Sequence, residues 1–110
     1  MIYKIFRAAE MAGFAAEGAT TGAPVDRADG YLHFSTAAQV AETLAKHFAG
    51  EDGLWILGCD ETRMAADLRW EPSRGGALFP HLYRALVRDD VVWARPLALG
   101  PAGHVLPDGL

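Results

Sequence analysis

The sequence has little that would hold a fold together covalently or anchor it in a membrane. Its single cysteine, Cys59, cannot form an internal disulfide, and its apolar surroundings favour a buried thiol in a reducing compartment. No apolar run approaches the ~20 residues that a membrane-spanning helix needs. The segment Met1–Arg7 is too short and too charged for a signal peptide. We therefore expect a cytoplasmic protein that makes no membrane contact.

Motifs of several common chemistries are also missing. The histidines, His33, His47, His81 and His104, do not have the spacing of a zinc site. There is no dinucleotide-binding glycine motif, no Walker loop and no nucleophile elbow. A net charge of −4 argues against a general nucleic-acid-binding surface, whereas a local positive pocket would still accept a small-molecule nucleotide or anion. A metal site built from His33, Glu71 and His81 stays open as an alternative, because distant positions can meet in a fold.

The length and composition fit one globular domain. The chain has 110 residues, of which 51% are hydrophobic and 22% charged, so it can bury a core without metals or disulfides. We predict a folded domain over residues 1–99 and a surface tail over residues 100–110, where proline and glycine recur without a pattern. The oligomeric state is not predicted by any of these features.

Apolar periodicity predicts more strands than helices. Alanine-rich composition predicts a helix over Arg7–Glu17, and apolar residues four apart predict a second helix from Thr36 to Phe48. The segment Ala19–Asp29 between them is predicted to be a loop. Residues Arg88–Asp90 are predicted to form the turn of a hairpin. These elements predict an α+β domain with a mixed, mostly antiparallel sheet. The predicted strands are Ile2–Phe6, Tyr31–Phe34, Leu54–Cys59, Leu68–Glu71, Leu82–Val87 and Val91–Leu99.

The first candidate site is the junction of a strand and a helix. Thr36 and Gln39 match a capping box, which predicts that the helix begins at Thr36. A helix start carries free N–H groups and a partial positive charge, so it favours an anion. The Ser35 and Thr36 hydroxyls lie at this start, and His33 precedes them.

Alternation along this strand separates its polar and apolar residues. Tyr31, His33 and Ser35 are predicted to share one face, while Leu32 and Phe34 point into the core. The polar face is either a cluster in a cleft or an ordinary half-exposed strand surface with satisfied hydrogen bonds. We favour the cleft, because this face adjoins the helix start.

The second candidate site lies within Trp70–Tyr83. Pro72 keeps Glu71 out of the helical region of backbone conformation, and His81 and Tyr83 are predicted to share one face of a strand. The alternative is a surface segment between strands.

A glycine-rich turn lies inside this second segment. Arg74 is a fixed cation, and Gly75 and Gly76 would let a ligand approach the backbone closely. Alternatively, Arg74 pairs with a carboxylate on the surface.

Three segments together resemble a family of small bacterial proteins known as domain of unknown function 952. They are Tyr3, the strand Gly30–Thr36, and the long stretch Trp70–Tyr83, and the resemblance covers residues 2 to about 98. Met11 departs from the pattern, because many family members carry tryptophan in the first helix.

More remotely, the family is similar to the ADP-ribosyltransferase fold, above all to tRNA 2′-phosphotransferases. His33–Ser35 matches half of their strand motif, with Tyr31 in place of a first histidine. This resemblance implies a split sheet that grips NAD⁺ or an ADP-ribose-like ligand. It implies that His33 hydrogen-bonds the ribose or amide, that Glu71 stabilises an oxocarbenium-like charge, and that Arg74 holds phosphate. The acidic chain lacks a basic surface for tRNA, which argues against that substrate.

Three functions of different classes are consistent with the sequence. The first is an enzyme that acts at the N-glycosidic bond of NAD⁺ or a related nucleotide, with Glu71 and His33 as catalytic residues. The second is a non-catalytic module that binds a nucleotide or small anion, and the third is an interaction protein without a ligand. The predicted ligand-binding residues are Tyr31, Ser35, Thr36, Arg74, Gly75, Gly76, His81 and Tyr83.

Overall fold

The computed structural model describes the backbone of residues 1–110 and every side chain except that of Arg74. It shows a small α+β domain with four α-helices and ten short strands. The helices are α1 (Ala8–Glu17), α2 (Pro24–Asp29), α3 (Val40–His47) and α4 (Glu61–Met64). The strands are β1 (Ile2–Phe6), β2 (Ala19–Thr20), β3 (Leu32–His33), β4 (Trp55–Cys59), β5 (Leu68–Pro72), β6 (Leu78–Leu82), β7 (Leu86–Val87), β8 (Val91–Pro96), β9 (Ala98–Gly100) and β10 (Gly103–Val105).

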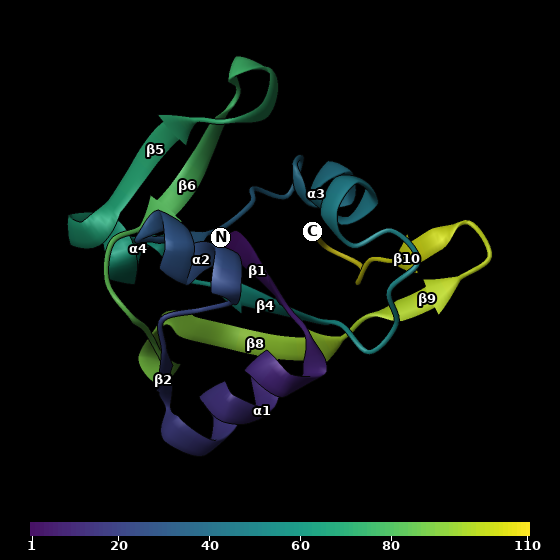
Figure 1. Ribbon diagram of the computed structural model, residues 1–110, viewed down its shortest axis with the longest axis horizontal. Coiled ribbons are helices and arrows are strands. Elements are labelled where there is room, and N and C mark those ends of the chain that lie inside the picture. The colour runs from purple at the N-terminus through teal and green to yellow at the C-terminus, as the bar shows by residue number, and fades with distance from the viewer.

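The central element is the three-stranded antiparallel sheet β1-β4-β8 (Figure 1). The strands predicted at β1 and β4 are confirmed, with Ile2 opposite Cys59 and Phe6 opposite Trp55. The predicted strand Val91–Leu99 is too long, because β8 ends at Pro96 and β9 begins at Ala98. Side chains alternate along β1, and both faces of that strand are buried. Lys4 therefore lies on the same buried face as Ile2 and Phe6, and its charge must be paired within the protein.

A second three-stranded sheet, β3-β6-β5, carries the polar segments that the sequence singles out. Its β5–β6 hairpin extends from the body at the upper left of Figure 1. In the register of this sheet His33 lies opposite His81, and Glu71 lies opposite Phe79. A backbone bridge between Tyr3 and Ser35 joins this region to β1 of the central sheet. The two remaining pairings, β2 with β7 and β9 with β10, are antiparallel as well.

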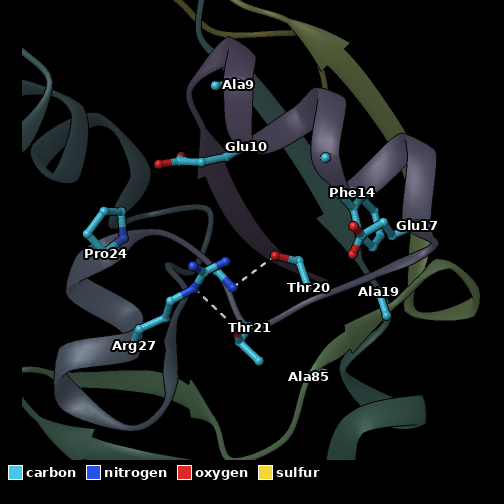
Figure 2. Close-up of a pocket in the computed structure, with 12 residues that line it drawn as sticks. Ala9, Glu10, Phe14, Glu17, Ala19, Thr20, Thr21, Pro24, Arg27 and Ala85 are labelled. Carbon is cyan, nitrogen blue, oxygen red and sulfur yellow. Dashed lines mark hydrogen bonds between the residues drawn. The ribbon is translucent and has the colours of Figure 1, made fainter.

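The predicted loop over Ala19–Asp29 is wrong, because it contains β2 and the helix α2. Pro24 is the first helical residue, where a missing N–H and a fixed φ cost nothing. Gly30 ends the helix in the left-handed conformation with φ 85°. The Arg27 side chain donates to the Thr21 hydroxyl at 3.1 Å and ties the helix to the preceding segment (Figure 2). A six-residue helix shows almost no periodicity in sequence, so pattern analysis misses it.

The predicted helix start at Thr36 is also wrong, because α3 begins at Val40. Only half of the capping box forms: the Gln39 side-chain oxygen accepts from the Thr36 N–H at 3.0 Å. The Gln39 amide nitrogen then donates to the Leu78 carbonyl in β6, which holds residues 36–39 in a turn. The preceding strand is shorter than predicted, since only Leu32–His33 pairs with β6.

The predicted strand Leu82–Val87 and the hairpin at Arg88–Asp90 are corrected by the pairing. β6 ends at Leu82 and β7 covers only Leu86–Val87, with Arg84 in the bend between them. Arg84 donates to both oxygens of the buried Asp90 carboxylate, at 2.7 and 3.0 Å. The two strands on either side of Arg88–Asp90 therefore do not pair with each other: β7 pairs with β2, and β8 pairs with β4.

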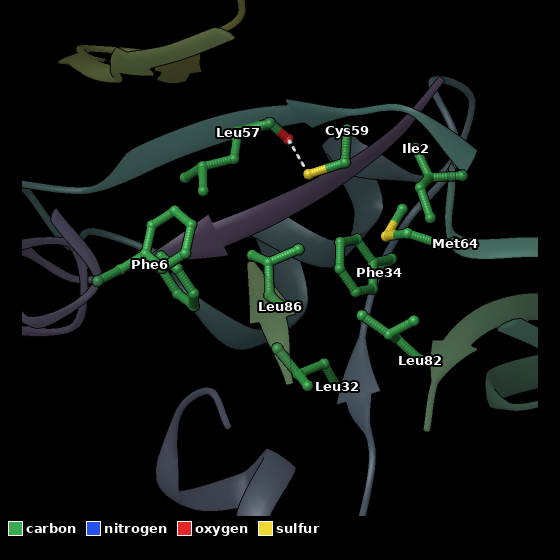
Figure 3. Close-up of a cluster of buried hydrophobic side chains, with 10 residues drawn as sticks. Ile2, Phe6, Leu32, Phe34, Leu57, Cys59, Met64, Leu82 and Leu86 are labelled. Atoms are coloured by element: carbon green, nitrogen blue, oxygen red, sulfur yellow. Dashed lines mark hydrogen bonds between the residues drawn. The ribbon is translucent and has the colours of Figure 1, made fainter. Parts of the chain in front are cut away.

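Two hydrophobic clusters fill the faces of the central sheet. One lies between β1 and β4 on one side and β3, β6 and β7 on the other, as Figure 3 shows for Phe6, Phe34, Leu82 and Leu86. The second lies under α3 on the opposite face. Its buried members are Tyr3, Ile5, Val40, Leu44, Leu54, Ile56 and Leu97.

The α+β class and the antiparallel pairing are confirmed, with two differences in detail. There are four α-helices instead of the predicted two, and every strand pair of the described backbone is antiparallel, so the sheet is not mixed. The tail contains β10, which pairs with β9, and Leu106 and Leu110 pack against the second hydrophobic cluster. In the described part of the chain no helix is both long and apolar enough to span a bilayer.

Candidate functional site

The pairing of β3 with β6 brings together four rings that the sequence analysis places in two separate clusters. His33 and His81 face each other across the strands, with ring centroids 5.3 Å apart. Tyr31 stacks on His81 at 4.2 Å and also contacts the rings of His33 and Tyr83, at 4.8 and 5.1 Å. The two segments that the sequence predicts to be functional therefore form one continuous surface.

Glu71 completes this group from the neighbouring strand β5. One of its oxygens, Oε1, accepts from the Tyr83 hydroxyl at 2.6 Å and lies 2.8 Å from His81 Nδ1. These two hydrogen bonds lower the pKa of Glu71, while the bond to Glu71 raises the pKa of the Tyr83 phenol. Because the Glu71 side chain stays 35% exposed, its carboxylate is an ionised, oriented group that a ligand can reach.

The contact with Glu71 also sets the protonation pattern of His81. An ionised carboxylate can only accept, so His81 Nδ1 carries the proton. In the neutral ring the lone pair is then on Nε2, and the ring itself is buried. This is the carboxylate–imidazole arrangement in which an acid fixes the tautomer and orientation of a histidine ring.

A second carboxylate, Asp26, orients His33. Its side chain is completely buried and accepts from both His33 Nδ1, at 2.7 Å, and the His33 backbone N–H, at 2.9 Å. It also accepts from Lys4 Nζ at 2.8 and 3.0 Å, and from the Ala23 N–H at 2.7 Å. On the other side of the ring, His33 Nε2 lies 2.9 Å from Asp29.

In the Lys4–Asp26 ion pair, burial and pairing act in opposite directions on the pKa of each member. Burial favours protonated Asp26, but the hydrogen bonds from His33 and Lys4 and the charge of Lys4 outweigh it and lower the pKa to about 2. For Lys4, burial dominates over the attraction of Asp26 and lowers the pKa. The pair is therefore held by mutual hydrogen bonding, and either charge alone would be poorly tolerated.

A cleft of about 570 Å³ adjoins these residues. His33, Ser35, Ser73 and His81 form part of its wall, and further residues come from β1, α2 and α3. The Ser35 and Thr43 hydroxyls lie 2.8 Å apart and join the β3 segment to α3. The volume falls within the usual range for small-molecule sites.

The molecule has a second hollow, of about 560 Å³, between α1 and the segment that leads into α2 (Figure 2). Glu10, Gly13 and Glu17 line it from α1, and Arg27 lines it from α2. None of the residues predicted to be functional belongs to its wall.

Comparison with known proteins gives the family. The family model described as "Protein of unknown function (DUF952)" matches residues 5–94. This chain belongs to the DUF952 family. No curated protein matches it.

Solved structures of one DUF952-like protein share the fold. The crystal structure of protein CC0527 from Caulobacter crescentus is 44% identical, covers 94% of this chain and 90% of its own, and has a TM-score of 0.88. A double mutant of CC0527 gives the same values. The solution NMR structure of CC0527 has a TM-score of 0.83 over 94% of this chain and 89% of its own.

In this DUF952 protein the predicted site residues are distributed unevenly. Tyr31, His33, Glu71, His81 and Tyr83 come together in one contact network. Ser35 is buried in the cleft wall.

The other predicted binding residues lie apart from this network. The Thr36 N–H is already bonded to Gln39, and Thr36 lies outside the cleft wall, so the predicted anion site at the helix start has no free donor at Thr36. Gly75 and Gly76, with φ 66° and 80°, form an exposed turn. The Arg74 side chain lies outside the described residues, and its predicted phosphate contact stays a prediction.

Sequence reasoning missed Lys4 and Asp26. A lysine inside an otherwise apolar strand, flanked by Ile2 and Phe6 on its own face, is the available signal for Lys4. Asp26 has no such signal, because it lies in a segment without periodicity. Among the described residues no group of three His, Cys, Asp or Glu is arranged to hold a metal, so the alternative metal site is not formed.

Proposed function

We propose that this DUF952 protein binds a nucleotide of the NAD⁺ or ADP-ribose type in the 570 Å³ cleft and acts at its N-glycosidic bond. The observation that carries the proposal is the oriented Glu71 carboxylate, which is held by Tyr83 and by His81, a residue of the cleft wall. The resemblance to ADP-ribosyltransferases supports the same reaction class.

The chemistry needs a negative charge at a fixed position. When the bond between the ribose C1′ and the nicotinamide nitrogen breaks, the electron pair leaves with nicotinamide and the sugar becomes oxocarbenium-like. Water or another acceptor then bonds to C1′ and loses a proton. A preorganised carboxylate stabilises this developing positive charge, and Glu71 is ionised because hydrogen bonds lower its pKa.

Two neighbouring groups fit supporting roles. The stacked Tyr31 ring offers a flat surface for a planar ring, and its contacts with His81 fix its position. His81, with its proton held on Nδ1 by Glu71, can accept the proton of the attacking water at Nε2.

Release of nicotinamide tests the proposal directly. The protein is incubated with NAD⁺ and the products are separated by chromatography, with Glu71→Gln as the test variant. Glu17→Gln is the matched control, because Glu17 is an exposed carboxylate on α1, outside the cleft. We expect turnover in the wild type and the control and a ~10²-fold or larger loss in Glu71→Gln. No release from the wild type, or unchanged release from Glu71→Gln, contradicts the proposal.

A non-catalytic module that binds a nucleotide or small anion is the second candidate, and the composition of the cleft wall favours it. Glu71 contacts His81, which lines the cleft, but Glu71 is not among the described residues of the wall, and binding alone does not require it there. Calorimetry with NAD⁺, ADP-ribose and AMP separates the candidates. Binding without nicotinamide release identifies a module, and the absence of heat with all three ligands excludes both candidates.

A further inference from the structure

His33 is held between two carboxylates, one on each ring nitrogen. Asp26 Oδ1 accepts a hydrogen bond from Nδ1 at 2.7 Å, and Asp29 Oδ2 is in ion-pair contact with Nε2 at 2.9 Å. Ionised carboxylates have no proton to donate, and hydrogen bonds, chiefly from His33, keep the pKa of Asp26 at about 2. A proton on each ring nitrogen satisfies both contacts, which is the bonding pattern of an imidazolium cation.

The two carboxylates differ greatly in how firmly they are held. Asp26 is completely buried and is fixed by Lys4, the Ala23 N–H and the His33 backbone N–H. Asp29 is 44% exposed, and His33 is the partner that holds its carboxylate. Asp29 is also the last residue of α2, where the helix dipole disfavours a negative charge. The contact of His33 Nδ1 with Asp26 is therefore held firmly by the surrounding residues. At Nε2, by contrast, a ligand can replace Asp29.

Replacement of Asp29 at His33 would change the net charge of this group of residues. Lys4 and the imidazolium are two positive charges, and Asp26 and Asp29 are two negative ones, so the group is neutral as it stands. Moving Asp29 away leaves one positive charge, with the donor Nε2–H free. Both His33 and Asp29 line the 570 Å³ cleft, so this donor would be available to a ligand there.

We propose that Asp29 occupies the binding position of an anionic ligand oxygen, and that a phosphate or carboxylate group replaces it on His33 Nε2. Asp26 and Lys4 hold the imidazolium in place for this exchange. The anion site is therefore at His33, in the cleft wall, and not at the start of α3. The inference adds a phosphate or carboxylate subsite to the proposed function, but it does not depend on turnover.

Removing the negative charge of Asp29 tests whether an external anion takes its place on His33. Inorganic phosphate and acetate are titrated separately into Asp29→Asn and wild-type protein, and the ¹⁵N signals of the His33 ring are followed by NMR. Asp89→Asn is the matched control, because it makes the same charge change at an exposed position outside the cleft wall. We expect Asp29→Asn to bind at least one of the anions about tenfold more tightly than wild type, and the control to match wild type.

A double variant shows whether His33 carries the effect. Asp29→Asn with His33→Gln should lose the tighter binding, since glutamine has a neutral donor. The backbone NMR spectrum of each variant verifies that it is folded. Equal affinity of Asp29→Asn, wild type and Asp89→Asn for both anions overturns the inference, as does tighter binding that survives in the double variant. Neither result depends on whether NAD⁺ is cleaved, so failure here is distinct from failure of the proposed function.

Discussion

The Tyr83 hydroxyl donates to Glu71 Oε1 at 2.6 Å, although the two residues are separated by the whole β5–β6 turn. Tyr83 follows β6 directly and Glu71 lies in β5, so the hairpin register sets this distance. Arg69 lies over the Tyr83 ring, 4.7 Å from its centroid, and helps to fix its position. The hairpin thus arranges a carboxylate and a phenol that no sequence motif links.

Replacing this phenol should change the ionisation of Glu71. Tyr83→Phe removes the stronger of the two hydrogen bonds that lower the pKa of Glu71, so that pKa should rise. The measurement is a ¹³C NMR titration of the Glu71 carboxyl carbon. Tyr31→Phe is the matched control. Tyr31 contacts the rings of His81 and Tyr83, but it has no hydrogen bond to Glu71 among the described contacts. An unchanged Glu71 pKa in Tyr83→Phe would show that the hydrogen bond is not formed in solution.

The Asp26 carboxylate should make stability depend on pH at the acid end. Its folded-state pKa of about 2 lies below the unfolded value of 3.8, so the folded state binds its proton less readily. This difference corresponds to about 2 kcal/mol of stability, present above about pH 4 and lost as the pH falls toward 2. Urea unfolding between pH 2 and 7 measures it.

The variant Asp26→Asn isolates this contribution. It leaves Lys4 buried without a negative partner, which should cost about 3 kcal/mol at neutral pH. Because the variant has no carboxyl group at this position, its free energy of unfolding should lack the decrease between pH 4 and 2 that Asp26 causes in the wild type. A variant whose acid sensitivity matches that of the wild type would mean that other carboxylates cause it.

Two glycines should respond in opposite directions to the same substitution. A methyl group at Gly58 in β4 would lie 2.5 Å from Trp93 Cε2 and 2.8 Å from Met1 Cε, so Gly58→Ala should destabilise the protein by ~1–3 kcal/mol. At Gly13 in α1 a methyl group meets nothing within 4 Å, so Gly13→Ala should stabilise the helix by ~0.5–1 kcal/mol. Thermal unfolding of both variants provides the comparison. A stable Gly58→Ala protein would contradict the packing of Trp93 over β4.

The Cys59 thiol should be inert in the folded protein. It is fully buried, and burial raises its pKa to about 12, so the reactive thiolate is scarcely populated at neutral pH. A chromogenic thiol reagent should therefore label it at the rate of unfolding, and quickly once urea is added. Fast labelling without denaturant would show that β4 opens locally.

The sequence locates the two polar segments of the candidate site better than it locates the elements between them. Alternation in Ile2–Phe6 and the apolar run of Leu54–Cys59 predict strands because burial on a sheet imposes those patterns directly. The helix α2 escapes prediction because six residues are too few to show a period. The predicted hairpin at Arg88–Asp90 is wrong because β7 pairs with β2 and β8 with β4, and the ion pair between Arg84 and the buried Asp90 carboxylate at this bend is not revealed by local patterns.

By itself the sequence determined the α+β class, the core strands and the polar faces of the Tyr31–Ser35 and Trp70–Tyr83 segments. Those properties follow from local alternation, which depends only on neighbouring residues. Tertiary structure alone decided that His33 meets His81 and that Asp26 reaches both Lys4 and His33. Such contacts join distant parts of the chain through strand register and buried charge pairing, and no local pattern encodes them.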